Sequence, residues 1–311
     1  MPSTRAARSR PKALSETEVA DLILDARNGT GESPVWHVGE QALYWVDIPG
    51  KAIHRWSPVQ GHRQWATAEM PACIAATPQP GRWIAGMETG LFALQLQEDG
   101  QVQAERLAAV QHGAPAMRFN DGRCDRQGRL WAGTMCLDMA AAIRAGAWYR
   151  FGTGDTALPA QLTDFIVPNG LAFSPDGRTM YLSDSHPQVQ GIWAFDYDLE
   201  TGTPSNRRLF VDMRPLPGRP DGAAVDVDGC YWICGNDAGL VHRFTPDGRL
   251  DRSLAVPVKK PAMCAFGGPR LDTLYVTSIR PGGDLADQPL AGGVFALNPG
   301  TQGIAEPAFR T

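Results

Sequence analysis

The sequence predicts an all-β fold, a six-bladed β-propeller, and three observations support this class. A strand pattern of two apolar residues, a third apolar residue and then small or polar residues occurs six times, and its second position is aromatic in five of the six copies. Its second position, at residues 44, 84, 131, 181, 232 and 275, recurs every 40 to 51 residues, which is the length of one propeller blade. Most copies follow a glycine-bearing turn, and 34 glycines with 25 prolines suit a chain of many short strands.

Each repeat predicts one small antiparallel sheet. The strands that carry the pattern span residues 43–47, 83–87, 130–134, 180–184, 231–235 and 274–278. A short apolar run precedes the turn, as at residues 170–173, and a third strand follows, as at residues 191–195, so each unit holds three or four strands. We expect residues 21–24 to pair with residues 293–297 and to close the ring against edge pairing. No stretch has the periodicity of an amphipathic helix, so the alternative is a β-sandwich of unrelated weak strands.

Composition and charge restrict the domain organisation. Hydrophobic residues make up 43% of the chain and charged residues 20%, which excludes a disordered protein and supplies a core. Residues 1–14 form a basic tail that we expect to be disordered, with a transit peptide as the alternative, and residues 15–311 form one propeller domain. The four basic residues of the tail have no acidic neighbour there, which leaves 25 basic residues against 33 acidic ones, a net charge of −8, on the rest of the chain.

The same counts restrict the partners. An acidic body with no further cluster of lysines and arginines argues against nucleic acid. No apolar run approaches a membrane span, and the tail lacks the apolar stretch of a signal peptide. The six cysteines form no CxxC pair, and the six histidines form no HxH or HExxH pattern. We therefore expect reduced, mostly buried thiols in a cytoplasmic protein with a small-molecule partner and no membrane partner, its oligomeric state left open.

One phase of the repeat places polar residues on the propeller axis. The first strand of each blade lines the central channel, so residues eleven to thirteen positions before the aromatic column converge there. These six ring positions are Glu32, Ala72, Asn120, Asn169, Asp221 and Ala262, and a proline precedes four of them. Two carboxylates and two carboxamides therefore share one ring, with alanine at the other two positions.

Converging carboxylates in a narrow channel repel one another, so we expect a cation among them. Oxygen ligands without histidine or cysteine favour Ca²⁺, Mg²⁺ or Mn²⁺, although Zn²⁺ also accepts carboxylate oxygen. Simpler interpretations are open for each residue: an ordinary turn at Asn120 or Asp221, a strand start at Asn169 and a solvated loop acid at Glu32. By contrast, Pro175-Asp176-Gly177 and Pro246-Asp247-Gly248 are out of phase with the ring and are interpreted as plain turns.

Neighbouring residues add to this candidate site. Arg118 lies two residues before Asn120, so both side chains face the same way on an extended strand. The positively charged guanidinium of Arg118 could orient an anionic or polyhydroxyl ligand. The alternative for Arg118 is a salt bridge between blades. Residues 136–146 form an alanine-rich insertion that could act as a lid, and Lys259-Lys260 is interpreted as a solvated turn.

These motifs resemble the SMP-30/gluconolactonase family of regucalcin-like sugar lactonases over residues 31–297. The matching stretches are Gly31-Glu32-Ser33-Pro34-Val35-Trp36, Arg118-Phe119-Asn120-Asp121-Gly122, Ala132-Gly133-Thr134-Met135, Pro168-Asn169-Gly170-Leu171, Pro220-Asp221-Gly222 and Cys264-Ala265-Phe266-Gly267-Gly268. The resemblance implies a six-bladed propeller with one divalent ion, Ca²⁺, Zn²⁺, Mg²⁺, Mn²⁺ or Fe²⁺, held by Glu32, Asn169 and Asp221. It also implies substrate contacts from Arg118 and Asn120. Animal members carry an acidic pair after the Gly-Thr-Met motif, where this chain has Cys136-Leu137, so Asp138 is its candidate acid at that place.

The function implied is metal-dependent hydrolysis of an aldonolactone, such as glucono-, xylono- or arabinonolactone, to the aldonic acid. The residue types fit this reaction if water attacks the lactone carbonyl, Asp221 is the base, and Arg118 and Asn120 hold sugar hydroxyls and the oxyanion. Two other functions stay open. One is an organophosphate or aryl-ester hydrolase that uses the same polar residues at the ring positions, and the other is a non-catalytic calcium-binding propeller.

Overall fold

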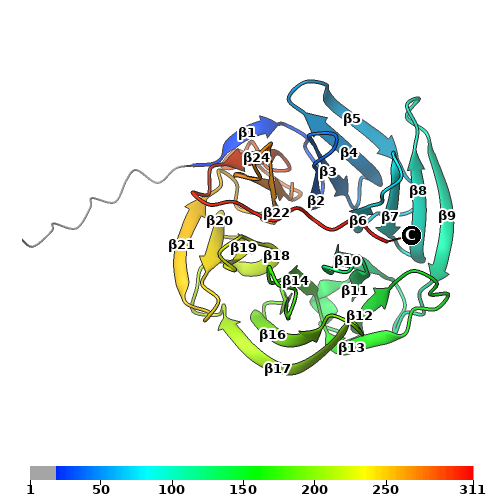
Figure 1. Cartoon of the computed structure of the whole chain (residues 1–311). Coiled ribbons are helices and arrows are strands. Elements are labelled where there is room, and N and C mark those ends of the chain that lie inside the picture. The colour runs from blue at the N-terminus through cyan, green and yellow to red at the C-terminus, as the bar shows by residue number, and fades with distance from the viewer. Residues whose placement is uncertain (1–18, 311) are drawn as a thin grey trace, which may run out of the picture.

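The computed structural model describes residues 19–310, and these form six four-stranded antiparallel sheets around a central axis (Figure 1). The predicted six-bladed β-propeller is therefore confirmed. The basic tail predicted for residues 1–14 lies outside the described residues. Among residues 19–310, no helix is long and apolar enough to span a membrane.

In five blades the strands follow the chain from the axis outwards (Figure 1). Blade 1 holds β2 (Gly31–His37), β3 (Ala42–Asp47), β4 (Ala52–Ser57) and β5 (Gly61–Ala66); blade 2 holds β6 (Cys73–Ala76), β7 (Arg82–Gly86), β8 (Gly90–Leu96) and β9 (Val102–Ala109). Blade 3 holds β10 (Met117–Cys124), β11 (Leu130–Cys136), β12 (Gly146–Phe151) and β13 (Ala160–Phe165); blade 4 holds β14 (Pro168–Phe173), β15 (Thr179–Asp184), β16 (Gly191–Asp198) and β17 (Thr203–Asp212). Blade 5 holds β18 (Arg219–Val225), β19 (Tyr231–Asn236), β20 (Leu240–Phe244) and β21 (Leu250–Ala255).

Blade 6 joins the two ends of the described chain. It holds β22 (Pro261–Gly267), β23 (Thr273–Ser278) and β24 (Val294–Leu297), and β1 (Asp21–Leu24) is its fourth strand. Asp21 pairs with Ala296 and Leu24 with Val294, as predicted from the sequence. The pairing covers the edge of β24 and closes the ring.

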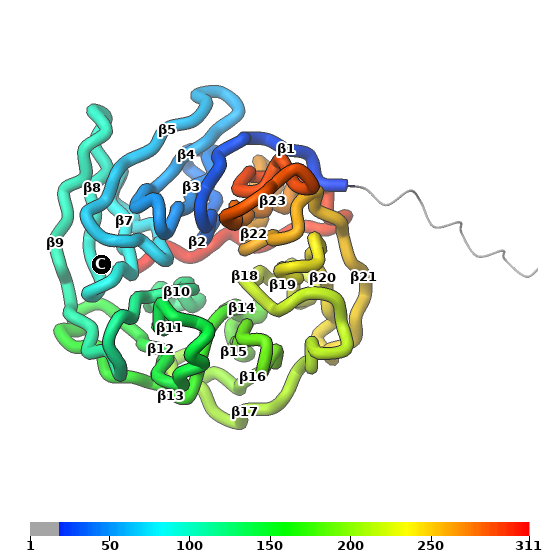
Figure 2. Tube along the Cα trace, turned by 180° about the vertical axis from the view of Figure 1, so that it is seen from behind, coloured from blue at the N-terminus to red at the C-terminus, as the bar shows by residue number. Residues whose placement is uncertain are grey.

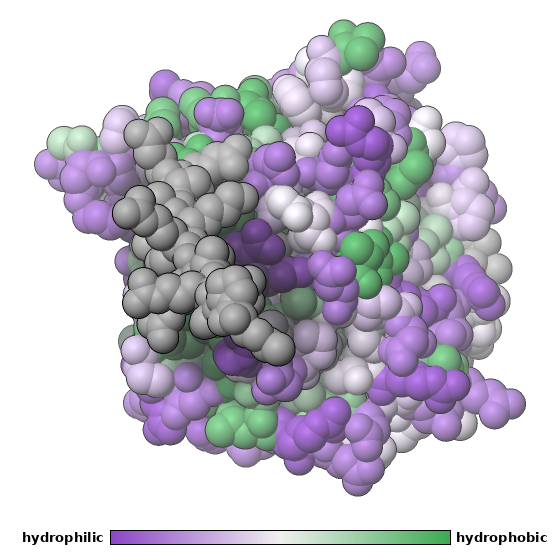
Figure 3. Space-filling view, turned by 60° about the vertical axis from the view of Figure 1, so that its left-hand side comes forward, coloured by the Kyte–Doolittle hydropathy of each residue, from purple (hydrophilic) through white to green (hydrophobic). Residues whose placement is uncertain are grey.

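The core lies between the blades, and the aromatic column of the repeat supplies much of it. Trp131 and Trp232 are fully buried, and Tyr44, Tyr181 and Tyr275 are nearly so. All six cysteines are buried and none forms a disulfide, so the predicted burial of the thiols is confirmed. The face in Figure 3 is mainly hydrophilic, with hydrophobic residues in small separate areas, as expected of a surface in contact with water.

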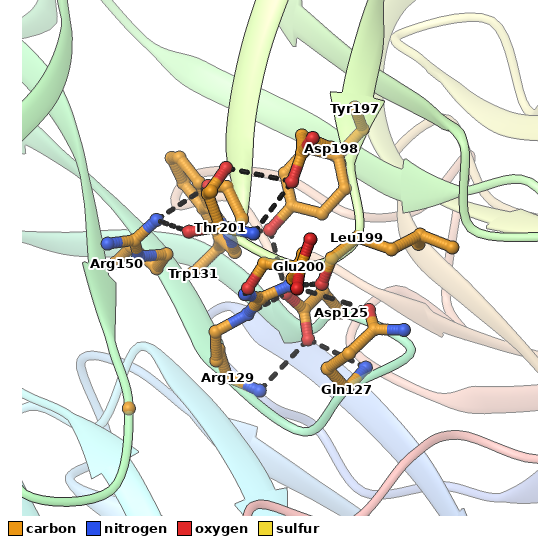
Figure 4. A network of polar contacts seen from close by, with 12 residues as sticks. Asp125, Gln127, Arg129, Trp131, Arg150, Tyr197, Asp198, Leu199, Glu200 and Thr201 are labelled. Carbon is orange, nitrogen blue, oxygen red and sulfur yellow. Dashed lines mark hydrogen bonds and ion pairs between the residues drawn. The ribbon is translucent and has the colours of Figure 1, made fainter.

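A buried acid, Asp125, ties the turn after β10 to blade 4. It accepts hydrogen bonds from the backbone N–H groups of Gln127 and Arg129, at 2.9 and 3.0 Å, and from the Tyr197 hydroxyl at 2.7 Å (Figure 4). Asp226 occupies the same place after β18, where its carboxylate accepts from Cys230 N and Trp232 Nε1. These two acids hold the hairpin turns and are not part of the channel site.

The C-terminal segment crosses one end of the channel. Gly303 pairs with Asp226, Phe309 N donates to Ala76 O at 2.7 Å, and Arg310 N donates to Gly128 O at 3.0 Å. These contacts lie beyond the C-terminal ends of the inner strands, and Figure 1 shows the red segment passing over the centre. The N-terminal ends of the inner strands therefore lie at the opposite end of the channel, on the side nearer the viewer in Figure 2.

Candidate active site

A cavity of about 210 Å³ lies at the N-terminal ends of the inner strands. Among the pockets of residues 19–310, it is the one that contains the four polar ring positions predicted from the sequence. Its lining comprises Thr30, Glu32, Arg118, Asn120, Met135, Met139, Val167, Asn169, Ser185, Arg219, Asp221, Asn236, Lys260, Ile279 and Pro281. Two larger pockets, one lined by Tyr181 and Phe210 and one by Tyr44 and Trp65, contain none of these residues. We therefore take the channel cavity as the candidate active site.

The four polar ring residues come together in this cavity from four blades. Glu32 extends from β2, Asn120 from β10, Asn169 from β14 and Asp221 from β18. Each is buried, with 3 to 9% of its surface exposed. Arg118 lines the same cavity, as its spacing from Asn120 predicts. The simpler interpretations of Asn120 and Asp221 as turns and of Glu32 as a solvated loop acid are wrong, because all three are buried within strands. Asn169 does stand at the start of β14, as its simpler interpretation has it, and lines the cavity as well.

Local strand geometry aims these side chains at the axis. In five of the inner strands, the regular pairing with the second strand of the same blade is interrupted. The interruption begins at the ring residue or at the residue before it. The irregular steps lie between Glu32 and Val35, Phe119 and Gly122, Asn169 and Ala172, Pro220 and Ala223, and Pro261 and Cys264. Only β6 pairs regularly among the inner strands described, and its ring residue, Ala72, precedes the strand. Bulges re-aim side chains, and here they do so at one phase of the repeat.

A chain of hydrogen bonds fixes the amides of the ring. Arg118 Nη1 donates to Asn120 Oδ1 at 2.9 Å, and Asn120 Nδ2 donates to Asn169 Oδ1 at 3.0 Å. Asn169 Nδ2 donates in turn to Ser185 Oγ at 2.8 Å, and the Ser185 hydroxyl donates to Pro220 O. Asn120 Nδ2 also donates to Pro168 O, so both its N–H groups are engaged. The chain links blades 3, 4 and 5 and keeps the amide oxygens available as acceptors.

The two carboxylates have few partners. Glu32 Oε2 accepts from Ser33 N at 3.3 Å, and Asp221 Oδ2 accepts from Asn236 Nδ2 at 2.6 Å. Among residues 19–310, neither acid forms an ion pair within 4 Å. Burial raises the pKa of Glu32 well above its ordinary value, and the negative charge of Asp221 raises it further. Burial likewise raises the pKa of Asp221 to about 7, against the effect of the Asn236 hydrogen bond.

The donor set fits a divalent cation. Two buried carboxylates that destabilise each other's charge, together with the amide oxygen of Asn169, provide three oxygen ligands from three blades. Glu32 Oε1 accepts no hydrogen bond from residues 19–310, so it is free to bind an ion. Glu32, Asn169 and Asp221 could therefore hold the ion, and the roles predicted for them stay predictions.

A third buried acid, Asp121, directly follows the ring residue Asn120 and is not among the site residues predicted from the sequence. Its Oδ2 accepts from Leu171 N at 2.8 Å, and its Oδ1 has no partner among the described residues. Burial raises the pKa of Asp121, and Arg123 opposes this effect. Asp121 does not line the cavity, but its charge adds to the negative potential at Glu32.

Three other sequence interpretations can be compared with the structure. Arg118 forms no salt bridge with any residue of the range 19–310, so the alternative of an ion pair between blades is wrong. Asp138 is exposed and its Oδ1 accepts from Ala140 N at 3.0 Å, which caps the short 3₁₀ helix η1 (Met139–Ala141). Met139 lines the cavity whereas Asp138 does not, so the insertion lies at the mouth and the substrate contact of Asp138 stays a prediction. Lys260, interpreted as part of a solvated turn, lines the cavity instead.

Several cavity residues were missed, although the sequence carries a signal for most of them. The residue two positions before each ring position forms a second tier, here called the rim positions: Thr30, Met70, Arg118, Val167, Arg219 and Lys260. All except Met70 line the cavity. Arg219 and Lys260 have the same spacing from Asp221 and Ala262 as Arg118 has from Asn120. Asn236 ends the second strand of blade 5 and Ser185 directly follows that of blade 4. Both stand four residues after the aromatic column, as do Met135 and Ile279, so this phase of the repeat is a second signal for cavity residues.

Comparison with known proteins places the chain in a family. The family model described as SMP-30/Gluconolactonase/LRE-like region matches residues 30–280. The chain belongs to this family. Among curated family relatives, a 6-deoxy-6-sulfogluconolactonase of Pseudomonas putida is 41% identical over 285 residues, which cover 90% of this chain and 94% of the relative. Regucalcin of Oryctolagus cuniculus is 36% identical over 292 residues, 91% of this chain and 96% of the relative.

Solved structures of the same family agree with the fold. A luciferin-regenerating enzyme superposes with a TM-score of 0.87 at 27% identity, covering 94% of this chain and 100% of that chain. A calcium-binding protein, regucalcin, from Agrobacterium tumefaciens gives a TM-score of 0.86 at 27% identity, covering 94% and 98%. The sequence resemblance to the SMP-30/gluconolactonase family is thereby confirmed.

Proposed function

We propose that the protein is a lactonase that hydrolyses a sugar-derived lactone, an aldonolactone, to the aldonic acid with the help of one divalent ion. One observation carries the proposal. Glu32, Asn169 and Asp221 converge with Arg118 and Asn120 in one buried cavity, in a chain 41% identical to a lactonase. Glucono-, xylono- and arabinonolactone are the candidate substrates.

Glu32, Asn169 and Asp221 would hold the ion, with Ca²⁺, Zn²⁺, Mg²⁺, Mn²⁺ and Fe²⁺ as candidates. Such an ion polarises a carbonyl and makes a bound water more acidic. The calcium-binding regucalcin with the same fold supports a divalent ion in this family, and the oxygen ligands support a hard one.

Asp221 is the proposed base. Its Oδ2, which accepts from Asn236, would also hold the ion, so Oδ1 is the atom that takes the proton of the attacking water. As the water oxygen bonds to the lactone carbonyl carbon, the bond from this carbon to the ring oxygen breaks. Asp221 Oδ1 then delivers its proton to the departing ring oxygen, and the product is the open-chain aldonic acid.

Arg118 and Asn120 are proposed to orient the substrate. Burial lowers the pKa of Arg118 only to about 10, so the guanidinium is charged near neutral pH and can stabilise the developing oxyanion. Both N–H groups of Asn120 are engaged within the protein, so Asn120 contacts the substrate by accepting from a sugar hydroxyl through Oδ1. A contact from Asp138 and a cytoplasmic location remain parts of the proposal; the six buried free thiols support the latter.

The test is a pH-indicator assay with pentono- and hexonolactones, run after chelation and re-addition of each candidate ion singly. Paraoxon-type and aryl esters in the same panel distinguish the rival hydrolase, and the absence of all turnover by ion-loaded protein would favour a calcium-binding propeller. Asp221→Asn should abolish lactone turnover. Asp247→Asn is the matched control, because it sits in the same Pro-Asp-Gly sequence but its carboxylate only accepts from Thr245 at a surface turn. Equal activity of the two variants would contradict the role of Asp221.

A further inference from the structure

The rim of the cavity has an uneven distribution of charge. Of the six rim positions, three carry cations: Arg118 in blade 3, Arg219 in blade 5 and Lys260 in blade 6. Arg118 is turned to the ring, where it donates to Asn120 and to Phe119 O. Arg219 and Lys260 belong to adjacent blades and form a separate basic pair, whereas the wall on the side of blades 3 and 4 is lined by Met135, Met139 and Val167.

One carboxylate holds this basic pair in place. Arg219 Nε donates to Asp237 Oδ2 at 2.6 Å, and Lys260 Nζ forms an ion pair with Asp237 Oδ1. Asp237 has a left-handed backbone with φ of 79°, an arrangement that few residues other than glycine adopt. Arg219 is also fixed by Nη1, which donates to Ser185 O at 3.1 Å. The two cations are thus preorganised at the cavity wall.

The pair has positive charge and hydrogen-bond donors in excess. Two cations share a single carboxylate, which leaves one net positive charge on these three residues. Their side chains are only 21% and 28% exposed for Arg219 and Lys260, against 43% for Asp237. Lys260 has three N–H groups and uses one within the protein, and Arg219 retains N–H groups that no residue of the range 19–310 accepts. A half-buried cation with unused donors beside a ligand cavity fits an anionic ligand group.

The position of the pair sets which part of a substrate it would meet. Arg219 precedes Asp221 by two residues on β18, which corresponds to about 6.6 Å along a strand. This distance is comparable to the length of a six-carbon lactone. A lactone with its carbonyl at the ring residues would therefore extend its far end to the rim.

We propose that Arg219 and Lys260 bind an anionic substituent, such as a sulfonate, phosphate or carboxylate, on the carbon of the lactone remote from its carbonyl. This inference rests on the proposed function and narrows its substrate class from neutral aldonolactones to anionic ones. The reaction that supplies such a substrate would be the oxidation at C1 of a sugar that already carries the anionic group.

The test compares kcat/KM for three lactones that differ at one carbon: glucono-1,5-lactone, its 6-phosphate and its 6-deoxy-6-sulfonate, with ion-loaded protein. We expect the two anionic lactones to exceed the neutral one by about tenfold or more, with a preference that weakens as salt is added. Lys260→Met and Arg219→Gln should each reduce this ratio by about tenfold. Lys259→Met is the matched control with an unchanged ratio, because Lys259 is adjacent, exposed and paired with Asp287.

A binding measurement makes the outcome independent of turnover. Calorimetry should show tighter binding of 6-phosphogluconate than of gluconate, and Lys260→Met should remove the difference. If no lactone is turned over but this difference is found, the proposed function fails and the anion subsite stands. Turnover without a preference for anionic lactones would overturn the subsite and leave the function intact. Inorganic phosphate that binds as tightly as 6-phosphogluconate would also overturn it, because the site would then hold a free anion.

Discussion

Asn236 Nδ2 donates a hydrogen bond of 2.6 Å to Asp221 Oδ2, the shortest contact that either cavity carboxylate makes with another side chain. Asn236 ends β19, directly beside β18, and is itself buried. The bond leaves Asp221 with one free oxygen and a fixed side-chain rotation. Asn236 is therefore a positioning residue for the proposed base and ion ligand.

Asn236→Ala should weaken binding of the divalent ion by about 10- to 100-fold, because the ligand carboxylate loses the group that orients it. Titration of the chelated protein with the ion, followed by calorimetry, gives the affinity directly. Asn236→Asp and Asn298→Ala are informative comparisons: the first adds a repelling charge, and the second removes an exposed amide that bonds only Gly300 N. Wild-type affinity in Asn236→Ala would show that Asp221 is held by other contacts.

The glycine that follows Asn169 should tolerate no side chain. Gly170 has φ of +66°, and a Cβ there would lie 2.5 Å from Ser183 Oγ and 2.6 Å from the Tyr231 hydroxyl oxygen. Gly170→Ala should therefore reduce both the free energy of unfolding and the affinity for the ion. Gly61→Ala is the matched control, with a similar φ of +69° and open space around it. Gly61→Ala should lower the free energy of unfolding by only about 1–2 kcal/mol, the cost of a left-handed backbone at a residue with a Cβ, and leave ion affinity unchanged.

Asp125→Ala should destabilise the fold without altering the cavity. Asp125 is fully buried and accepts from Gln127 N, Arg129 and Tyr197, so its removal leaves several donors unpaired (Figure 4). Loss of one member of a buried ionic network costs about 3–5 kcal/mol. Urea unfolding measures this, with Asp196→Ala as the comparison, since its pair with Arg208 is exposed and should contribute far less. Similar losses in the two variants would contradict the structural role of Asp125.

The sequence predicts the fold and the ring well because both follow from periodicity. A strand pattern that recurs at blade length fixes the number of sheets, and one phase of it places Glu32, Asn120, Asn169 and Asp221 in a single cavity. The contacts between the ring and the second strands follow the repeat in part. Asn236 contacts Asp221 in blade 5, and Ser185 contacts Asn169 at the same two positions of blade 4, four residues after the aromatic column. The ion pair between Asp237 of blade 5 and Lys260 of blade 6 has no such counterpart, so no pattern indicates it.

The interpretation of Lys260 shows where local reasoning fails. Two adjacent lysines after an apolar strand favour a solvated turn by composition, and Lys259 does occupy an exposed position. Lys260, however, stands two residues before the ring residue Ala262 and so has the same phase as Arg118. Because the ring residue of blade 6 is alanine, it is not part of the polar pattern that indicates the site. The sequence therefore gives no polar ring residue from which the position of Lys260 could be counted.

A histidine far from the cavity should make the stability of the protein sensitive to acid. Burial, followed by the neighbouring His62, lowers the pKa of His54 from 6.5 to about 4, while Asp47 acts in the opposite direction. The ring nitrogens of His54 contact Asn28 Nδ2 at 3.2 Å and His62 Nε2 at 3.0 Å. Protonation of His54 is therefore disfavoured in the folded state.

The sign of the effect follows from linkage. The folded protein binds this proton less readily than the unfolded chain, so the full stability is present above pH 6.5 and is lost as the pH falls towards 4. The shift corresponds to about 3 kcal/mol. Urea unfolding at several pH values in this window should show the loss in the wild type and a smaller one in His54→Gln, whose side chain is neutral throughout. Parallel curves for the two proteins would mean that other groups cause the acid sensitivity.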